Sequence, residues 1–325
     1  MKYFCPIHLD RPLSQEALAL TCAEGHEIPM EQCGRFSIPR FDVAEEREVS
    51  VNERLYVGDS LNVKYSNFLD WLFRTFRTSE VEFRKSIFER MSLAHGAEVL
   101  VTGCGNGDDL LVLSDLFGDL DLRLHGQDIS NTMVTHSAGR LEDSRQVVEL
   151  NVSNASHLPY GEEQFDVVFH FGGINYFSER AAAISEMTRV VRPAGKVVII
   201  DEGLAPWLRD TEYGRMMLNN NSLWSAQPPL RELPLNAVDV CLSWVLANCF
   251  YLLEFSKDPE FPNVDLDVVH VGQRGGSIRT RYHGQLEGVA PHLRDMARRQ
   301  AVSRGMSDSE YLAALIESDV ARDSA

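Results

Sequence analysis

The sequence predicts an α/β fold built on a doubly wound parallel sheet, and three observations predict it. Short apolar segments alternate with segments of helical spacing between residues 99 and 201, which is the pattern of a parallel sheet with helices on both faces. Glycine stands at every second position of the loop after the first apolar segment, at Gly103, Gly105 and Gly107. Asp128 ends the next apolar segment, at the edge of the sheet where ligands of such folds bind.

The individual elements follow from runs of apolar or periodic residues. Apolar runs rich in β-branched residues favour buried strands, and longer periodic runs favour helices. The expected strands are 99–101, 120–127, 147–151, 165–170 and 196–201, and the expected helices of the sheet region are 108–116 and 178–191. Aromatic and aliphatic residues at helical spacing over 62–91 predict two helices that pack over the edge of the sheet.

The glycine loop indicates a ligand class. A backbone without Cβ atoms lets a ligand approach closely, and a carboxylate at the end of the second strand can bind the hydroxyls of a ribose. The spacing differs from the Gly-x-Gly-x-x-Gly pattern that serves a pyrophosphate, and the chain has no Gly-Lys-Ser/Thr sequence for phosphates. A nucleoside without phosphates therefore fits best, and a tight turn without a ligand is the alternative.

Five stretches of the chain together resemble the class I S-adenosylmethionine-dependent methyltransferases, in the branch of the ubiquinone and menaquinone enzymes. They are Val-Leu-Val-Thr-Gly-Cys-Gly-Asn-Gly (99–107), Gly-Gln-Asp-Ile-Ser (126–130), Asn-Ala-Ser-His-Leu-Pro-Tyr (154–160), Phe-Asp-Val-Val-Phe (165–169) and the long stretch 186–201. The resemblance runs from about residue 65 to residue 257. It implies a Rossmann-like sheet of seven strands, completed by an antiparallel pair within 241–257, and S-adenosyl-L-methionine as the cofactor.

The resemblance also implies a set of cofactor-binding residues, with the glycine loop along the methionine and ribose and the Asp128 carboxylate on the ribose hydroxyls. Two positions depart from the family: Thr102 stands where an acidic residue commonly opens the loop, and Asn154 where an Asp commonly contacts the adenine amine. An amide oxygen can still accept from an amine, whereas Thr102 removes one partner for the cofactor's ammonium group. The predicted set is Tyr65, Thr102, Gly103, Gly105, Gly107, Asp128, Ile129, Asn154, Ala155 and His170.

Methyl transfer from a sulfonium is an in-line displacement, so the protein contributes mainly by alignment and, for a hydroxyl acceptor, by removing a proton. The strand that ends near residue 169 is expected to bring His170, Asn175 and Tyr176 to the methyl group. We interpret these three as candidate catalytic residues. His170 is either a general base or a buried histidine held by hydrogen bonds.

The insertion at 203–236 is expected to roof the acceptor site, as it does in related enzymes, and Trp207 and Trp224 are its candidate substrate contacts. Beyond the core, 268–284 is interpreted as a β-hairpin, followed by helices at about 289–304 and 307–318.

Arg279 and Arg281 concentrate positive charge in this C-terminal segment of an acidic chain. They are candidate substrate residues that clamp an anionic acceptor through planar guanidinium pairs. An exposed strand face or a subunit contact is the alternative.

The first 43 residues contain a candidate zinc site. Cys5 and His8 form one pair and Cys22 and His26 another, and the two pairs supply four donors for tetrahedral zinc. The segment has few large apolar residues, so a bound metal would explain how it folds. It resembles the zinc ribbon of the large-subunit ribosomal RNA guanine methyltransferases, with His8 in place of a Cys. Cys33 could replace any one of these four ligands, and a zinc ion held by four protein ligands would be structural. The alternative to a metal site is that these residues are scattered surface histidines and small core cysteines.

Length and charge set further bounds. The 325 residues are expected to divide into a zinc ribbon (1–43), a helical linker and cofactor cap (44–95), a methyltransferase core (96–257) and a C-terminal extension (258–325). A net charge of −17 disfavours nucleic acid and anionic membranes as partners. The chain has no apolar run long enough to cross a bilayer and no secretory signal, which predicts a cytoplasmic protein. A homodimer is compatible with the sequence.

Three functions compete. The motifs favour an enzyme that transfers a methyl group from S-adenosyl-L-methionine to O, N or C of a small-molecule metabolite. The alternative is a methyltransferase of ribosomal or transfer RNA bases that docks through the zinc ribbon. A third is a degenerate domain that binds the cofactor or a partner protein without turnover, because Thr102 and Asn154 depart from the family pattern.

Overall fold

The structure is a computed structural model that describes residues 3–8, 11–16, 18–41, 61–269, 271 and 277–323. Most of the charged segment expected to be a linker therefore lies outside the described residues. Contacts divide the chain into two compact units, Met1–Phe261 and Pro262–Ala325. The division into four segments that the sequence suggests stays a prediction.

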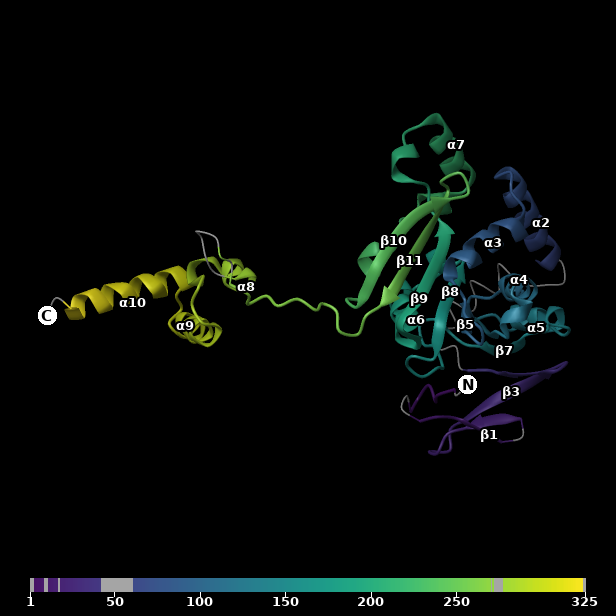
Figure 1. The fold of residues 1–325 in the computed structure, drawn as a ribbon, viewed down its shortest axis with the longest axis horizontal. Coiled ribbons are helices and arrows are strands. Elements are labelled where there is room, and N and C mark those ends of the chain that lie inside the picture. Colours follow the sequence, from purple (N-terminus) through teal and green to yellow (C-terminus); the bar gives the residue numbers. More distant parts are fainter. Residues whose placement is uncertain are drawn as a thin grey trace. The chain divides into compact units, whose positions relative to one another are not determined.

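A seven-stranded sheet forms the centre of the first unit (Figure 1). Its strands are β5 (Glu98–Thr102), β6 (Arg123–Asp128), β7 (Val147–Val152), β8 (Phe165–Phe171), β9 (Val191–Glu202), β10 (Ala237–Val245) and β11 (Phe250–Lys257). They lie in the order β10-β11-β9-β8-β5-β6-β7. Strands β5 to β9 are parallel, and β11 is antiparallel to both β9 and β10. The predicted fold class is confirmed, including the antiparallel pair that completes the sheet.

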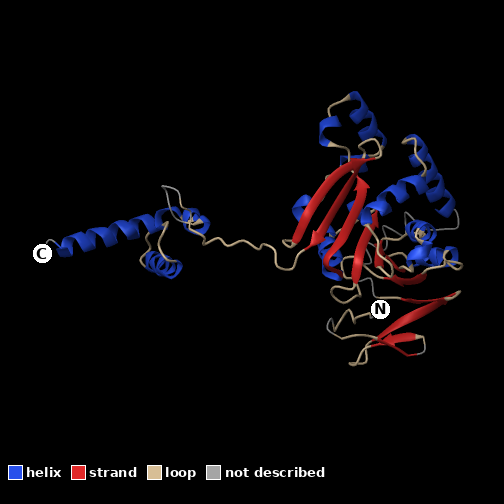
Figure 2. Cartoon of the chain, viewed as in Figure 1, coloured by secondary structure: helices blue, strands red, loops and turns tan. Residues whose placement is uncertain are grey.

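The central strands are buried on both faces, which is why their sequences are continuous apolar runs rather than alternating ones. In β5, Val99 and Val101 belong to one hydrophobic core and Leu100 to the core on the other side of the sheet. The first core receives side chains from α2 (Leu61–Thr75), α3 (Glu80–Phe88), α4 (Asp108–Leu116) and α5 (Asn131–Arg140). The second receives them from α6 (Arg180–Val190), so that the sheet lies between helical layers (Figure 2).

The start of α3 and its contact with α4 are fixed by polar groups. Ser79 and Glu82 form a capping box, in which each side chain accepts a hydrogen bond from the other residue's amide. Arg84 is buried and pairs with Asp109 in the first turn of α4. Removing either partner of a buried ion pair leaves the other charge uncompensated, so this pair fixes α3 against the helix that follows the glycine loop.

The insertion between β9 and β10 is made of short helices. They are η4 (Pro206–Leu208), α7 (Glu212–Asn220), η5 (Ser222–Ser225) and η6 (Leu230–Glu232). Trp224 is buried and packs edge-on against Phe76, with ring centroids 6.3 Å apart. This tryptophan therefore anchors the insertion on the first core. The other short turns are η1 (Glu89–Met91), η2 (Gly118–Leu120) and η3 (Ile174–Tyr176).

A small antiparallel sheet precedes the core. Its strands are β1 (Ser14–Glu16), β2 (Ala19–Thr21), β3 (Glu27–Cys33) and β4 (Phe36–Pro39). Among the described residues of this region, Leu20, Ile28 and Phe41 form a small buried core against which Tyr3, Leu13 and Met30 pack. Phe36 and Ile38 of β4 belong instead to the first core of the main sheet. This N-terminal module, residues 3–41, therefore depends on the main sheet for much of its apolar packing.

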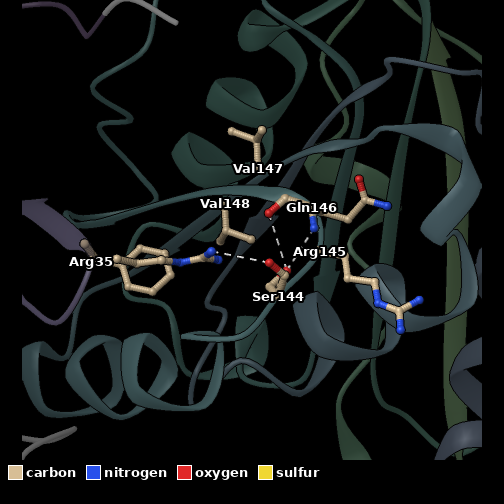
Figure 3. A pocket seen from close by; sticks show the side chains of 7 residues that line it. Arg35, Ser144, Arg145, Gln146, Val147 and Val148 are labelled. Carbon is tan, nitrogen blue, oxygen red and sulfur yellow. Dashed lines mark hydrogen bonds between the residues drawn. The ribbon is translucent and has the colours of Figure 1, made fainter.

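Hydrogen bonds join the N-terminal module to β7. Arg40 forms a parallel bridge with Val152, and the amide of Phe41 donates to the Val152 carbonyl at 2.9 Å. The guanidinium of Arg35 donates to the carbonyls of Leu141 at 2.9 Å and Ser144 at 3.3 Å. Figure 3 shows Arg35 reaching Ser144 across the shallow groove at this seam.

The opposite edge of the sheet is irregular. The pairing of β10 with β11 shifts register between Val238 and Cys241, and Asp239 in this bulge has a φ of 52°. A bulge of this kind bends the strand and increases its twist.

The helices that the structure describes in the second unit are α8 (Ile278–Tyr282), η7 (Gly284–Leu286), α9 (Pro291–Ser303) and α10 (Asp308–Asp323), and residues 262–269 precede them without helix or strand. The two predicted helices are present, but the predicted β-hairpin at 268–284 is wrong. The amide of Arg281 donates to the Ser277 carbonyl at 2.9 Å, which closes a helical turn where the second strand was expected. A lone two-stranded hairpin is marginal in water without a further strand or a covering helix. Among the described helices, none combines the length and apolarity needed to span a bilayer.

Gly126 lets β6 pack closely against α4 and β7. A Cβ at this position would lie 2.7 Å from Cδ1 of Leu110 and 2.7 Å from Cδ2 of Leu150. Gly126→Ala is therefore expected to lower the free energy of unfolding by about 1–3 kcal/mol through overpacking, as measured by urea denaturation.

Gly139→Ala in α5 is the matched control, because no atom lies within 4 Å of the added Cβ. It should leave the free energy of unfolding unchanged or raise it by up to about 1 kcal/mol, since Ala favours helix more than Gly does. Equal stability of the two variants would contradict this account of the packing.

Candidate active site

A cavity of about 710 Å³ opens at the carboxyl ends of the parallel strands. This edge is where ligands bind in open α/β sheets, and the volume suits a nucleoside together with a small second ligand. Each of β5 to β9, or the loop that follows it, contributes lining residues, and α2 and the insertion after β9 complete the wall.

Two glycines of the loop after β5 line the cavity with bare backbone. Gly103 and Gly105 have φ values of 60° and 53°, in the left-handed region that favours glycine. A Cβ on Gly105 would meet no atom within 4 Å, whereas one on Gly103 would lie 3.0 Å from Cε1 of His170. The loop therefore exposes main chain to the cavity at Gly105 and fits closely against β8 at Gly103.

Asp128 lies across from this loop at the end of β6 and is 9% exposed. Its Oδ2 accepts from the amide of Gly105 at 2.9 Å and its Oδ1 from the amide of Ser130 at 2.8 Å. Burial raises the pKa of this carboxyl, although the backbone amides oppose the shift. Each carboxylate oxygen has a second lone pair, so Asp128 can accept two further hydrogen bonds, such as those of a diol.

The same half of the cavity contains Ile129, Asn154 and Ala155, as the family resemblance implies. The side-chain oxygen of Asn154 accepts from the amide of Ser156 at 2.8 Å, which shapes the turn after β7. The structure thus brings together Gly103, Gly105, Asp128, Ile129, Asn154 and Ala155 from the predicted cofactor set.

His170 at the end of β8 lines the other half and is fully buried. Its Nδ1 lies 2.9 Å from the carbonyl oxygen of Thr102, which can only accept, so Nδ1 carries the proton. Burial lowers the pKa of the imidazole. Neutral His170 therefore has an unprotonated Nε2, and this atom has no hydrogen-bond partner among the described residues.

Two consecutive carboxyl groups end β9. Asp201 is fully buried, and its two oxygens accept from the amides of Asn175 and Glu202, each at 2.8 Å. Glu202 lines the cavity. Burial first, and then hydrogen bonding and repulsion from Asp201, raise the pKa of Glu202 to about 10. Glu202 is therefore a neutral acid at neutral pH.

Asn175 holds the end of β9 rather than the cavity wall. Its Nδ2 donates to the Glu202 carbonyl at 2.8 Å, and its Oδ1 accepts from the hydroxyl of Tyr251 at 3.2 Å. The neighbouring Tyr176 does line the cavity and is 54% exposed. Of the three candidate catalytic residues, His170 and Tyr176 thus reach the cavity, and Asn175 positions the backbone of Glu202.

Other predicted site residues lie elsewhere. Thr102 is buried behind the loop, where its hydroxyl contacts Phe169 and His170. Gly107 caps α4, and a Cβ there would lie 2.4 Å from Oγ of Ser137, so its role is close packing. Tyr65 belongs to α2, but its side chain is outside the described part of the chain.

The two tryptophans predicted to contact the substrate do not line the cavity. Trp224 is a core residue, and Trp207 is 61% exposed and packs against Trp244. Arg279 and Arg281 belong to the second unit, where they pair with Asp267 and Glu287. Their proposed contact with a substrate stays an untested prediction.

Sequence reasoning missed several lining residues. They include Phe68 and Trp71 of α2, Gly172 and Gly173 after β8, Glu202, and Asn220, Asn221 and Leu223 of the insertion. Glu202 follows directly on the predicted strand 196–201, so its position at a carboxyl end was a usable signal. The asparagines were not predictable in this way, because they are placed by the packing of the insertion on the core.

The N-terminal module contains a cluster of metal-type ligands. Donor atoms of Cys5, His8 and Cys22 lie within 4.8 Å of one another. Sγ of Cys5 is 3.1 Å from Nδ1 of His26, and Sγ of Cys22 is 3.4 Å from Nδ1 of His8. Burial acts to raise the pKa of Cys22, but hydrogen bonds from His26 and His8 outweigh it and lower the pKa to about 7. Cys33 lies apart, with Sγ 3.9 Å from the Thr135 carbonyl.

Comparisons with known proteins bear on the core. Residues 100–199 match the family model described as a methyltransferase domain. A demethylmenaquinone methyltransferase of Oceanobacillus iheyensis is 32% identical over 161 residues, which cover 48% of this chain and 62% of that protein. Phosphoethanolamine N-methyltransferase 1 of Arabidopsis thaliana is 27% identical over 136 residues, or 42% of this chain and 27% of that protein.

Among solved structures, phosphoethanolamine N-methyltransferase 2 of Haemonchus contortus in complex with S-adenosyl-L-methionine aligns with a TM-score of 0.50 and 15% identity. The alignment covers 68% of this chain and 62% of that one, and it concerns the fold alone. The chain spans less than two thirds of the curated relatives above. The core thus has the predicted fold, and residues 100–199 of it are similar to a methyltransferase domain.

The carboxyl of Glu202 makes stability depend on pH. The pKa of Glu202 in the folded state lies above the ordinary value of 4.5. The contribution of this carboxyl to stability is therefore complete below about pH 4.5, and it is lost as the pH rises from there toward the raised pKa, because the unfolded chain then releases the proton while the folded protein keeps it. Glu202→Gln should therefore flatten the fall of stability above about pH 5 and raise the free energy of unfolding by about 1–2 kcal/mol at about pH 8, measured by urea denaturation.

Glu212→Gln provides a matched control, because Glu212 is exposed on α7 and outside the cavity. Its pH profile should follow that of the unmodified protein. A Glu202→Gln profile that falls as steeply as that of the unmodified protein would show that Glu202 is ionised in the folded state.

Proposed function

We propose that this protein transfers a methyl group from S-adenosyl-L-methionine to a small-molecule acceptor. The observation that carries the proposal is the carboxylate of Asp128 beside the bare backbone of Gly105, at the carboxyl end of a parallel sheet. Asp128 retains acceptor capacity for two ribose hydroxyls, and Gly105 leaves room for a ligand against its main chain.

The residues present fit this cofactor. Gly103 and Gly105 would lie along the methionine and ribose, Ile129 against the adenine, and Asn154 and Ala155 at its edge. When bound, the cofactor supplies a methyl group already activated on a sulfonium. The protein then needs to hold the acceptor in line and to exclude water, and the rings of His170 and Phe177, which line the cavity with centroids 5.4 Å apart, would help to exclude water.

The comparisons support a small acceptor without identifying it. The named relatives act on demethylmenaquinone and on phosphoethanolamine, as their names say, and these two acceptors differ in chemistry. An RNA acceptor finds less support, because Arg279 and Arg281 already pair with carboxylates within their own unit.

Asp128→Ala is expected to weaken the binding of S-adenosyl-L-methionine by about 10–100-fold, because two hydrogen bonds from the ribose lose their charged acceptor. Isothermal titration calorimetry measures this directly. Asp143→Ala removes an equal charge from an exposed position and should leave the affinity unchanged. Absence of binding by the folded, unmodified protein would reject the proposal.

We also propose that Cys5, His8, Cys22 and His26 hold a structural zinc ion. Bonds of about 2.0–2.3 Å to zinc place tetrahedral donors roughly 3.5 Å apart, and the donor atoms of Cys5 and His8 are 3.5 Å apart. Two thiols and two imidazoles form a closed set that leaves no position for a substrate, so the metal would supply folding energy rather than catalysis.

Purified protein is then expected to contain about one zinc ion per chain by elemental mass spectrometry. Cys22→Ser should reduce this content severalfold, because one charged ligand is lost. Cys241→Ser serves as the control, since Cys241 is exposed on β10 and far along the chain from the cluster. Equal zinc content in both variants, or none in the unmodified protein, would contradict a zinc site at these residues.

A further inference from the structure

We propose that the methyl acceptor is a small amine whose protonated nitrogen binds the carboxylate of Glu202. This inference rests on the proposed function and specifies its substrate class. It leaves open which atom of the acceptor receives the methyl group.

The charge of the cavity wall is the first argument. The ionisable acids that line it are Asp128 in the cofactor half and Glu202 in the other half. Among the described side chains of the wall, none is a lysine or an arginine. The protein wall therefore offers no counter-charge to an anionic acceptor, whereas a cation finds a carboxyl group.

The arrangement of Asp201 and Glu202 is the second argument. Asp201 is fully buried next to Glu202, and both of its oxygens accept from backbone amides. The titratable groups that act on Glu202 from the neighbouring elements are Tyr176 on η3 and Tyr251 on β11, and both phenols have raised pKa values and stay neutral. Arg180 on α6 also acts on Asp201, but its guanidinium already pairs with Glu232. A bound ammonium therefore adds a positive charge at the carboxyl pair while Glu202 releases its proton.

His170 places a second, buried acceptor in the cavity wall. Its Nε2 is buried, unprotonated and without a partner among the described residues, and the ring lines the same cavity. An unprotonated ring nitrogen can only accept. Because this nitrogen has almost no accessible surface, Glu202 is the acceptor on this side that a ligand in the cavity can reach, and as a carboxylate it only accepts.

Aromatic rings complete the environment of a cation. Phe68 and Trp71 of α2 lie side by side, with centroids 6.0 Å apart, and they line the cavity together with Tyr176. All three are partly exposed to solvent. A ring face within reach of an ammonium group stabilises it further.

The test compares three probes with one skeleton and different charge: phenylpropylamine, phenylpropanol and phenylpropanoate. Each is titrated calorimetrically into the full-length protein saturated with S-adenosylhomocysteine, which occupies the cofactor half. The amine is expected to bind at least about tenfold more tightly than the alcohol or the carboxylate, a difference of about 1.4 kcal/mol. Titrations in buffers of different ionisation enthalpy should show release of about one proton per amine bound.

Glu202→Gln should remove both the preference for the amine and the proton release, while S-adenosylhomocysteine still binds. Glu212→Gln should change none of these. Tighter binding of the carboxylate, no binding of the amine, or an unchanged preference in Glu202→Gln would each overturn the inference. Failure to bind S-adenosylhomocysteine at all would instead count against the proposed function.

Discussion

The hydrogen bond between the amide of Gly105 and the carboxylate of Asp128 is the interaction on which the site depends. It joins the ends of two adjacent parallel strands and sets the path of the glycine loop. Because Asp128 is nearly buried, the loop amides and the carboxylate compensate each other where water is scarce. The same contact leaves main chain exposed on one side of the cavity and lone pairs on the other.

Much of this arrangement is readable in the sequence. Strands buried on both faces need continuous apolar runs, and the runs at 99–101 and 165–170 coincide with β5 and β8. The left-handed backbone at Gly103 and Gly105 favours glycine, so the glycine pattern in the sequence identifies this loop. Elements whose conformation is a local necessity are thus the ones that the sequence predicts well.

What the sequence does not reveal is set by tertiary packing. Residues 277–282 are rich in β-branched and aromatic residues, yet they form a helical turn because no sheet is available to pair with them. Thr102 resembles a loop residue that faces the ligand, but its hydroxyl is turned into the core toward Phe169. Neither outcome follows from residue type or spacing, since each depends on which neighbours the rest of the fold supplies.

The seam between the N-terminal module and β7 has a consequence for association. An uncovered outer strand is a template for annealing with another chain, but the terminal carbonyl of β7 at Val152 already accepts from Phe41. At the opposite edge of the sheet, the bulge around Asp239 in β10 interrupts the regular hydrogen-bonding pattern that an added strand would need. The regular addition of a further strand from another molecule is thereby hindered at both edges of the seven-stranded sheet.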